Sequence, residues 1–333
     1  MLRTKASLVG TAITVVAALT ALSAGPAQSA SGGAEAKGTT PAKVIGALAH
    51  QGAMDQNPAR IFWHNSSTNE TQIWFMIDNR IASRGSVADG NGNPIRFGTP
   101  WEIEGMADFD RNGSPDILWH NTNTKETEVW YMDGNRYAGR QSLLEESGSP
   151  TRVGAPWQIV GVTDFDLNGH PDILWHNVTT NESQIWYMNG TRIAVRQSVV
   201  EESGNPTHVG TPWEIAGVGG LNVFGGRDIF WHNTSTNETQ IWYMDFNSRI
   251  RSRRTVVEES GSPTHVGAPW QIAGVTDFDR EGSPDILWHN TSTNETQIWY
   301  MNDARIGSRV NVLEESGSPT HVGAPWEIVG STN

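Results

Sequence analysis

The amino-acid sequence predicts an all-β fold, and three observations lead to that prediction. First, a Trp-His-Asn triplet recurs with its tryptophan at positions 63, 119, 175, 231 and 288, so successive copies lie 56 or 57 residues apart. Second, each repeat contains four short apolar or β-branched segments separated by turn-forming residues. Third, most of these segments are almost continuously apolar, as expected for strands covered on both faces. Together they predict a five-bladed β-propeller, a ring of four-stranded antiparallel sheets.

The repeat that begins at Trp157 shows how one blade is expected to form. A strong hairpin signal, Asn189-Gly190, separates the last two predicted strands. The segment 203–212 then leads to the next repeat. In order, the four predicted strands are Trp157 to Phe165, Asp172 to Asn177, Gln184 to Met188, and Arg192 to about Glu201.

The two ends of the chain suggest how the ring closes. Residues 326–330 form a first strand that no second strand follows, whereas residues 60–65 form a second strand that follows the poor strand candidate 44–50. We expect the C-terminal strand to complete the first blade and so remove exposed edges. The alternatives are that residues 44–50 fill this place, or that the repeats form a β-solenoid, whose coils are shorter and need capping ends. The predicted blades are 60–97 plus 326–330, 101–153, 157–209, 213–266 and 270–322.

The start of the chain predicts export. Residues 1–30 have a basic start, an apolar run and a small-residue region typical of a signal peptide, and residues 31–58 resemble a flexible leader before the propeller of residues 59–333. We therefore expect a secreted, extracellular protein without a membrane span after signal removal. The chain has no cysteine, so disulfides contribute nothing to its stability. A net charge of −13 argues against nucleic acid or an anionic membrane as a partner and suits cation binding.

An acidic loop joins the first and second predicted strands in three repeats. In the copy from Asp164 to Asp172, oxygen-bearing side chains occupy loop positions 1, 3, 5 and 9, and the glycine at position 6 permits a sharp turn. Because Ca²⁺ prefers six to eight oxygen ligands, this spacing predicts a structural calcium site. The alternative is a network of Asx turns without an ion. The predicted ligands are Asp108, Asp110, Asn112 and Asp116; Asp164, Asp166, Asn168 and Asp172; and Asp277, Asp279, Glu281 and Asp285.

The loop pattern Asp-x-Asp-x-Asn-Gly-x-Pro-Asp, followed by Ile-Leu-Trp, resembles the FG-GAP/VCBS repeat family. That family includes the propeller of integrin α-subunits and a fungal lectin propeller, and the resemblance covers about residues 59–330. It implies calcium in these loops and a ligand on the opposite face. Blade four retains only Asp228 of the motif, with Gly220, Asn222 and Phe224 at positions 1, 3 and 5, so we predict no ion there. Blade one would have a split loop with Asn333 near position 1, and five blades are fewer than the seven more usual in the family.

Antiparallel connectivity places the acidic loops on one face and the loops between strands two and three, and between blades, on the other. This second face collects aromatic and polar side chains suited to sugar recognition, in which C–H groups stack on rings and hydroxyls hydrogen-bond. The predicted ligand-binding residues are Trp157, Trp213, Trp270, Trp326, His208, His265 and His321. The tryptophans also suit packing between blades, and the triplet histidines suit hydrogen-bonded packing.

Pairs of adjacent glutamates recur in four repeats, and a carboxylate pair can act as acid and base. Adjacent strand residues point to opposite faces, so we expect these glutamates to protect an outer edge and not to flank one bond. The pairs begin at Glu145, Glu201, Glu258 and Glu314.

The composition and motifs favour a binding protein over an enzyme. Our leading hypothesis is a secreted, calcium-stabilised propeller that binds glycans or cell-surface glycoconjugates without catalysis, with repeated weak sites strengthened by avidity. The second is a protein-binding or adhesion module of the same fold. The third, a polysaccharide-acting enzyme, lacks a recognisable catalytic signature, and no copy of the repeat is specialised for it.

Overall fold

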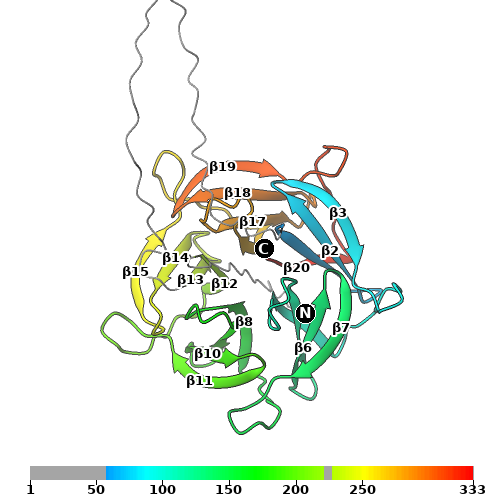
Figure 1. Cartoon of the computed structure of the whole chain (residues 1–333). Helices are drawn as coiled ribbons and strands as arrows, with labels where there is room; N and C mark the ends of the chain where they lie inside the picture. The colour runs from blue at the N-terminus through cyan, green and yellow to red at the C-terminus, as the bar shows by residue number, and fades with distance from the viewer. Residues whose placement is uncertain (1–57, 221–226, 333) are drawn as a thin grey trace, which may run out of the picture. The chain divides into compact units, whose positions relative to one another are not determined.

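The computed structural model describes residues 58–220 and 227–332. Within them the chain forms twenty β-strands in five four-stranded sheets arranged in a ring (Figure 1). The predicted five-bladed propeller is therefore confirmed. The signal segment, almost all of the leader and the alternative strand 44–50 lie outside the described residues.

Each blade contains four strands, which run in the following order from the centre of the ring to its rim. Blade one contains β20 (Trp326–Thr332), β1 (Arg60–Asn65), β2 (Glu70–Ile77) and β3 (Arg80–Ser86). Blade two contains β4 (Trp101–Ala107), β5 (Asp116–Asn121), β6 (Thr127–Asp133) and β7 (Arg136–Ser142). Blade three contains β8 (Trp157–Thr163), β9 (Asp172–Asn177), β10 (Ser183–Asn189) and β11 (Arg192–Ser198). Blade four contains β12 (Trp213–Gly219), β13 (Asp228–Asn233), β14 (Thr239–Met244) and β15 (Ile250–Thr255). Blade five contains β16 (Trp270–Thr276), β17 (Asp285–Asn290), β18 (Thr296–Asn302) and β19 (Arg305–Asn311).

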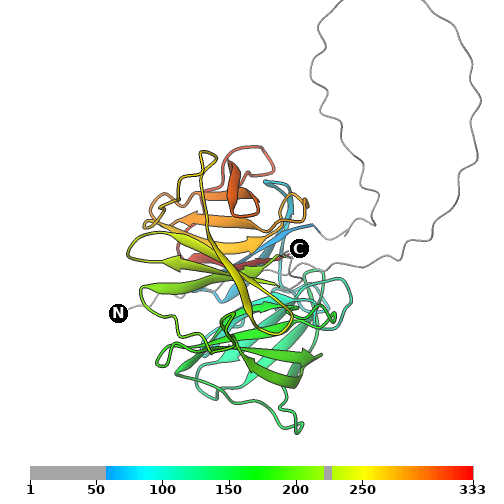
Figure 2. The same ribbon diagram turned by 90° about the vertical axis from the view of Figure 1, so that its left-hand side faces the viewer.

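Two pairings close the ring: one lies within blade one, between the C-terminal strand and the first described strand, and the other joins blade five to blade one. The C-terminal strand β20 pairs antiparallel with β1, from Arg60 opposite Thr332 to Asn65 opposite Trp326. In Figures 1 and 2 this red strand lies beside the blue strands of blade one. At the rim, Leu313 forms a parallel bridge with Arg80. The predicted closure by the C-terminal strand is confirmed.

The apolar core lies between neighbouring blades. Five clusters of buried side chains each combine residues of two adjacent blades, and the first strands contact one another around the ring. The second strands of blades two to five are buried along their whole length, which explains their continuous apolar sequence. The largest contributions come from the five triplet tryptophans, each at most 2% exposed: Trp63, Trp119, Trp175, Trp231 and Trp288.

The outermost strands end earlier than predicted. In blade three, β11 stops at Ser198, because Val200 turns toward the next blade and its amide donates to the Ser248 carbonyl at 2.9 Å. The glutamate pairs that follow were predicted to protect an edge. In the structure, the first glutamate of each pair forms an ion pair with an arginine of the following blade. These outer ion pairs are Glu145–Arg196, Glu201–Arg253, Glu258–Arg309 and Glu314–Arg84.

Candidate cation sites and an inter-blade cavity

Three acidic loops each bring three carboxylates together. In each loop one oxygen from every member lies within 4.8 Å of the others. The three groups contain loop positions 1, 3 and 9, as the sequence predicted. Their members are Asp108, Asp110 and Asp116 in blade two; Asp164, Asp166 and Asp172 in blade three; and Asp277, Asp279 and Asp285 in blade five.

The carboxylate at position 9 anchors the loop to its own blade. Asp116 is fully buried; its Oδ2 accepts from the Phe109 amide and its Oδ1 from the Met132 amide, each at 2.8 Å. The other two loops repeat this pattern. Asp116 Oδ2 also accepts from the Asp110 amide at 3.3 Å, whereas the Met132 amide is the donor to Oδ1, so Oδ1 keeps a second lone pair to offer a cation.

The carboxylate at position 1 shapes the turn. The Asp108 oxygens accept from the amides of Asn112 at 3.0 Å and Gly113 at 2.8 Å. Gly113 has a φ of 87°, where a Cβ atom would be strained. The loop sequence therefore folds around its own first carboxylate.

At loop position 5 of blades two and three, the side-chain oxygen accepts a hydrogen bond from a backbone amide of the same turn. Asn112 Oδ1 accepts from the Ser114 amide, and Asn168 Oδ1 accepts from the His170 amide, both at 2.7 Å. In blade five, Glu281 is exposed and lies outside the acidic group. The structure thus brings together nine of the twelve predicted metal ligands and gives position 5 a role in the turn.

The electrostatics of the three groups favour a hard cation. Burial, and secondarily the neighbouring aspartates, raises the pKa of Asp116, Asp172 and Asp285 to about 8. In blade five, Asp277 Oδ1 is buried and has no hydrogen-bond partner. A buried carboxylate repelled by two neighbouring carboxylates in each loop, together with the Asp277 oxygen that lacks a donor, fits Ca²⁺, whose ligands are oxygens.

Blades one and four each have an arginine at loop position 9 or directly before it. Arg60 of blade one aligns with the position 9 aspartates, and Arg227 of blade four precedes Asp228. Both arginines are buried. The predicted loop residues Asn222, Phe224 and Asn333 lie outside the described residues.

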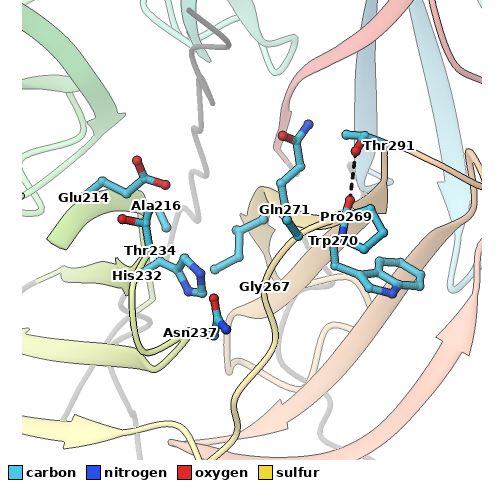
Figure 3. A pocket seen from close by; sticks show the side chains of 12 residues that line it. Glu214, Ala216, His232, Thr234, Asn237, Gly267, Pro269, Trp270, Gln271 and Thr291 are labelled. Atoms are coloured by element: carbon cyan, nitrogen blue, oxygen red, sulfur yellow. Dashed lines mark hydrogen bonds between the residues drawn. The ribbon is translucent and has the colours of Figure 1, made fainter. Parts of the chain in front are cut away.

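A cavity of about 230 Å³ lies between blades four and five, on the face opposite the acidic loops. In Figure 3, Glu214, His232 and Asn237 lie on one side, and Gln271 and Thr291 on the other. The strand register fixes its position: in blade five the cavity lies near the Trp270–Asn290 pair, whereas the acidic loop follows the Thr276–Asp285 pair at the other end. The full lining is Glu214, Ala216, His232, Thr234, Asn237, Gly267, Ala268, Pro269, Trp270, Gln271, Ile272 and Thr291.

His232 contributes to both the packing and the cavity wall. Its Nδ1 lies 3.0 Å from Thr239 Oγ1, and its ring meets the Trp288 ring edge-on at 5.9 Å. Burial lowers its pKa, so the imidazole is neutral at pH 7. The other four triplet histidines make the same edge contact with the next blade.

The predicted ligand-binding residues are divided between cavity, core and solvent. Trp270 lines the cavity, but its indole extends away from His232 (Figure 3) and packs against the cluster that contains Trp288. Trp157, Trp213 and Trp326 are likewise half-buried against their clusters. The lining does not include His265; like His208 and His321, it is exposed. Glu214 and Asn237 were not predicted.

Comparison with known proteins adds three solved structures of low similarity. A protein of unknown function from Bacteroides caccae is 14% identical, with 76% of this chain and 73% of that chain covered and a TM-score of 0.40. A lectin of Agrocybe aegerita described as recognising non-reducing terminal N-acetylglucosamine is 12% identical, with 77% and 80% covered and a TM-score of 0.40. A streptogramin B lyase is 11% identical, with 80% and 69% covered and a TM-score of 0.37. No family model and no curated protein matches the chain.

In the described part of the chain, no helix is long and apolar enough to cross a membrane.

Proposed function

We propose that this protein is a secreted, calcium-stabilised propeller that binds carbohydrate without catalysis, and that its repeats belong to the FG-GAP/VCBS family. The observation that carries the binding proposal is the cavity between blades four and five. Its polar lining combines a carboxylate, a neutral imidazole, two amides and two hydroxyls. This combination matches the alternating donors and acceptors of a sugar.

The size of the cavity favours a small ligand. Its volume of about 230 Å³ is below the range of roughly 300–1,000 Å³ that drug-sized ligands occupy. A single sugar unit at the end of a glycan fits this description better than a folded partner, which would need a larger interface.

Calcium has a structural role in this proposal. The acidic loops lie at the opposite end of the strands from the cavity, so an ion there would not touch the sugar. It would neutralise the three clustered carboxylates of each loop, of which the one at position 9 is buried, and fix the loops that join the first and second strands. Ion removal would therefore weaken sugar binding through the fold.

Similar cavity residues recur around the ring, but the copies differ. The position of Asn237 is also asparagine in blades one, three and five, whereas blade two has Lys125. The position of Thr234 is occupied in blade three by Val178, whose side chain is 50% exposed. We therefore expect several sugar sites of unequal strength, which together bind a glycan-coated surface by avidity.

A glycan array probed with residues 31–333, in calcium and again in EDTA, tests the proposal. We expect binding to one sugar class that weakens on chelation. A blank array in both conditions would contradict carbohydrate binding and direct the search to protein partners.

Isothermal titration with the sugar found on the array then locates the site. Glu214→Ala is expected to remove or weaken one site, while Glu315→Ala, on an exposed crossover, leaves the titration unchanged. Unaltered binding by Glu214→Ala would place the sugar elsewhere on the ring.

A further inference from the structure

Arg227 is a fixed positive charge at the boundary between two acidic loops. It is the largest fully buried charged side chain among the described residues. Its Nη1 donates to the Gly220 carbonyl of its own blade at 2.6 Å, and its Nε donates to the Asp164 carbonyl of blade three at 3.2 Å. Burial lowers its pKa only to about 10, so it stays charged at pH 7. The guanidinium thus touches position 1 of both loops.

The same place is neutral beside the other two acidic loops. Position 8 of a blade packs near position 1 of the preceding blade in two places: Arg227 contacts Asp164, and a Cβ on Gly220 would lie 3.0 Å from Pro284 Cγ. By this repeat, the loop of blade two faces Pro171, and the loop of blade five faces Ala59. Of the three acidic loops, only that of blade three has an arginine at position 8 of the following blade.

The fixed charge has opposite consequences for the two loops it joins. In blade four it lies beside the buried Asp228 and attracts that carboxylate, as a metal ion does in an acidic loop. In blade three it lies beside a group of three carboxylates, where a divalent cation would be repelled by it. The exposed Arg111, whose Nη2 lies 3.5 Å from the Asn168 carbonyl, adds a weaker charge to the same loop.

We propose that Arg227 replaces the metal ion in blade four and makes blade three the weakest of three calcium sites. This inference rests on the calcium-binding part of the proposed function. Blade one follows the same logic, because the buried Arg60 occupies the position of the ninth-position aspartate. Calcium therefore binds to three of the five blades, in two affinity classes.

Calcium titration of residues 31–333, freed of metal by chelation, tests this inference. We expect two tighter sites and one site at least about tenfold weaker, from the repulsion between a unit charge and a divalent ion. Asp164→Asn should remove the weak class, whereas Asp108→Asn and Asp277→Asn should each remove one tight site. Four or five bound ions, three equal sites, or loss of a tight site in Asp164→Asn would overturn the inference.

Replacing the arginine provides an independent test. Arg227→Pro introduces the residue that blades two, three and five carry at this position, and Arg227→Gln keeps the length and removes the charge. Either folded variant should bind calcium at least about tenfold more tightly at the weak site and unchanged at the other two. Arg140→Gln, on the exposed strand β7, is the control and should have no effect. An unchanged weak site in a folded Arg227 variant would contradict the role of its charge.

The result also separates this inference from the proposal on which it rests. If no calcium binds to any variant, the calcium-stabilised propeller itself is wrong. If three ions bind equally, only the role of Arg227 is wrong.

Discussion

Substituting Gly161 by alanine is expected to destabilise the ring, because two first strands pack tightly there. A Cβ atom on Gly161 in β8 would lie 2.7 Å from both γ-carbons of Val218 in β12. Val218 is fully buried, and its branched side chain has no flexible end that could move aside. Overpacking of this kind costs about 1–3 kcal/mol of unfolding free energy.

A urea denaturation series with a double-mutant cycle measures this cost. Gly139→Ala is the control, since a Cβ there meets nothing within 4 Å, and it reports the effect of alanine on the unfolded chain. Val218→Ala removes the clashing methyl groups and loses core contacts. The double variant should be more stable than the sum of the single effects predicts, by at least about 1 kcal/mol.

Two results would refute the packing argument. One is a Gly161→Ala variant with the same midpoint as Gly139→Ala. The other is a double variant whose cost equals the sum of the single costs, because the two residues would then not touch.

Three further predictions concern the rim, the histidines and the ions. Glu258→Ala should lower the free energy of unfolding by at most about 0.5 kcal/mol, because its ion pair with Arg309 is more than one-third exposed. Arg309→Ala should lower it by about 1 kcal/mol, because the guanidinium also lies 4.2 Å from the centre of the Trp299 ring. Equal losses in urea denaturation would contradict this difference. Burial lowers the pKa of His176, His232 and His289 below their unfolded value of 6.5, so the unfolded chain binds more protons below that pH and stability falls there, by at most about 1.4 kcal/mol for each histidine at pH 5.5. The raised pKa values of Asp116, Asp172 and Asp285 act in the opposite direction in the ion-free protein, so the comparison is made in saturating calcium, which keeps these carboxylates ionised. Equal urea midpoints at pH 7.5 and pH 5.5 under this condition would contradict it. EDTA should lower the melting temperature by at least roughly 5 °C. The reason is that each site saturated by calcium at one hundred times its Kd adds about 2.7 kcal/mol to the free energy of unfolding. An unchanged melting temperature would count against calcium binding.

The sequence predicts the architecture well because the repeat period and the strand patterns near the two ends can be recognised directly in the sequence. Residues 326–330 form a first strand that lacks a second strand, and residues 60–65 form a second strand that lacks a good first strand. The simplest arrangement places both in one blade, and the pairing of β20 with β1 confirms it. The nine clustered carboxylates follow from spacing within one short loop. None of these inferences requires knowledge of how neighbouring blades meet.

Features that join two blades were missed, because the sequence pattern within one repeat does not show how neighbouring blades meet. The partner of Glu145 is Arg196, 51 residues away, and no local pattern reveals the pair. His265 is exposed and does not line this cavity, whereas Val266 beside it packs against the core, a division that local spacing does not reveal. Arg227 could have been noticed, since it replaces the proline of the other loops, but its contact with Asp164 emerges only from the assembled ring.

A crystal structure of the chain grown with calcium and the best array sugar tests the central claim most directly. We expect the sugar in the cavity lined by Glu214, His232 and Asn237, or in its counterparts between other blades, with ions in the loops of blades two, three and five. Sugar bound on the acidic-loop face, or inter-blade cavities filled only by water in crystals that hold the sugar elsewhere, would contradict the account.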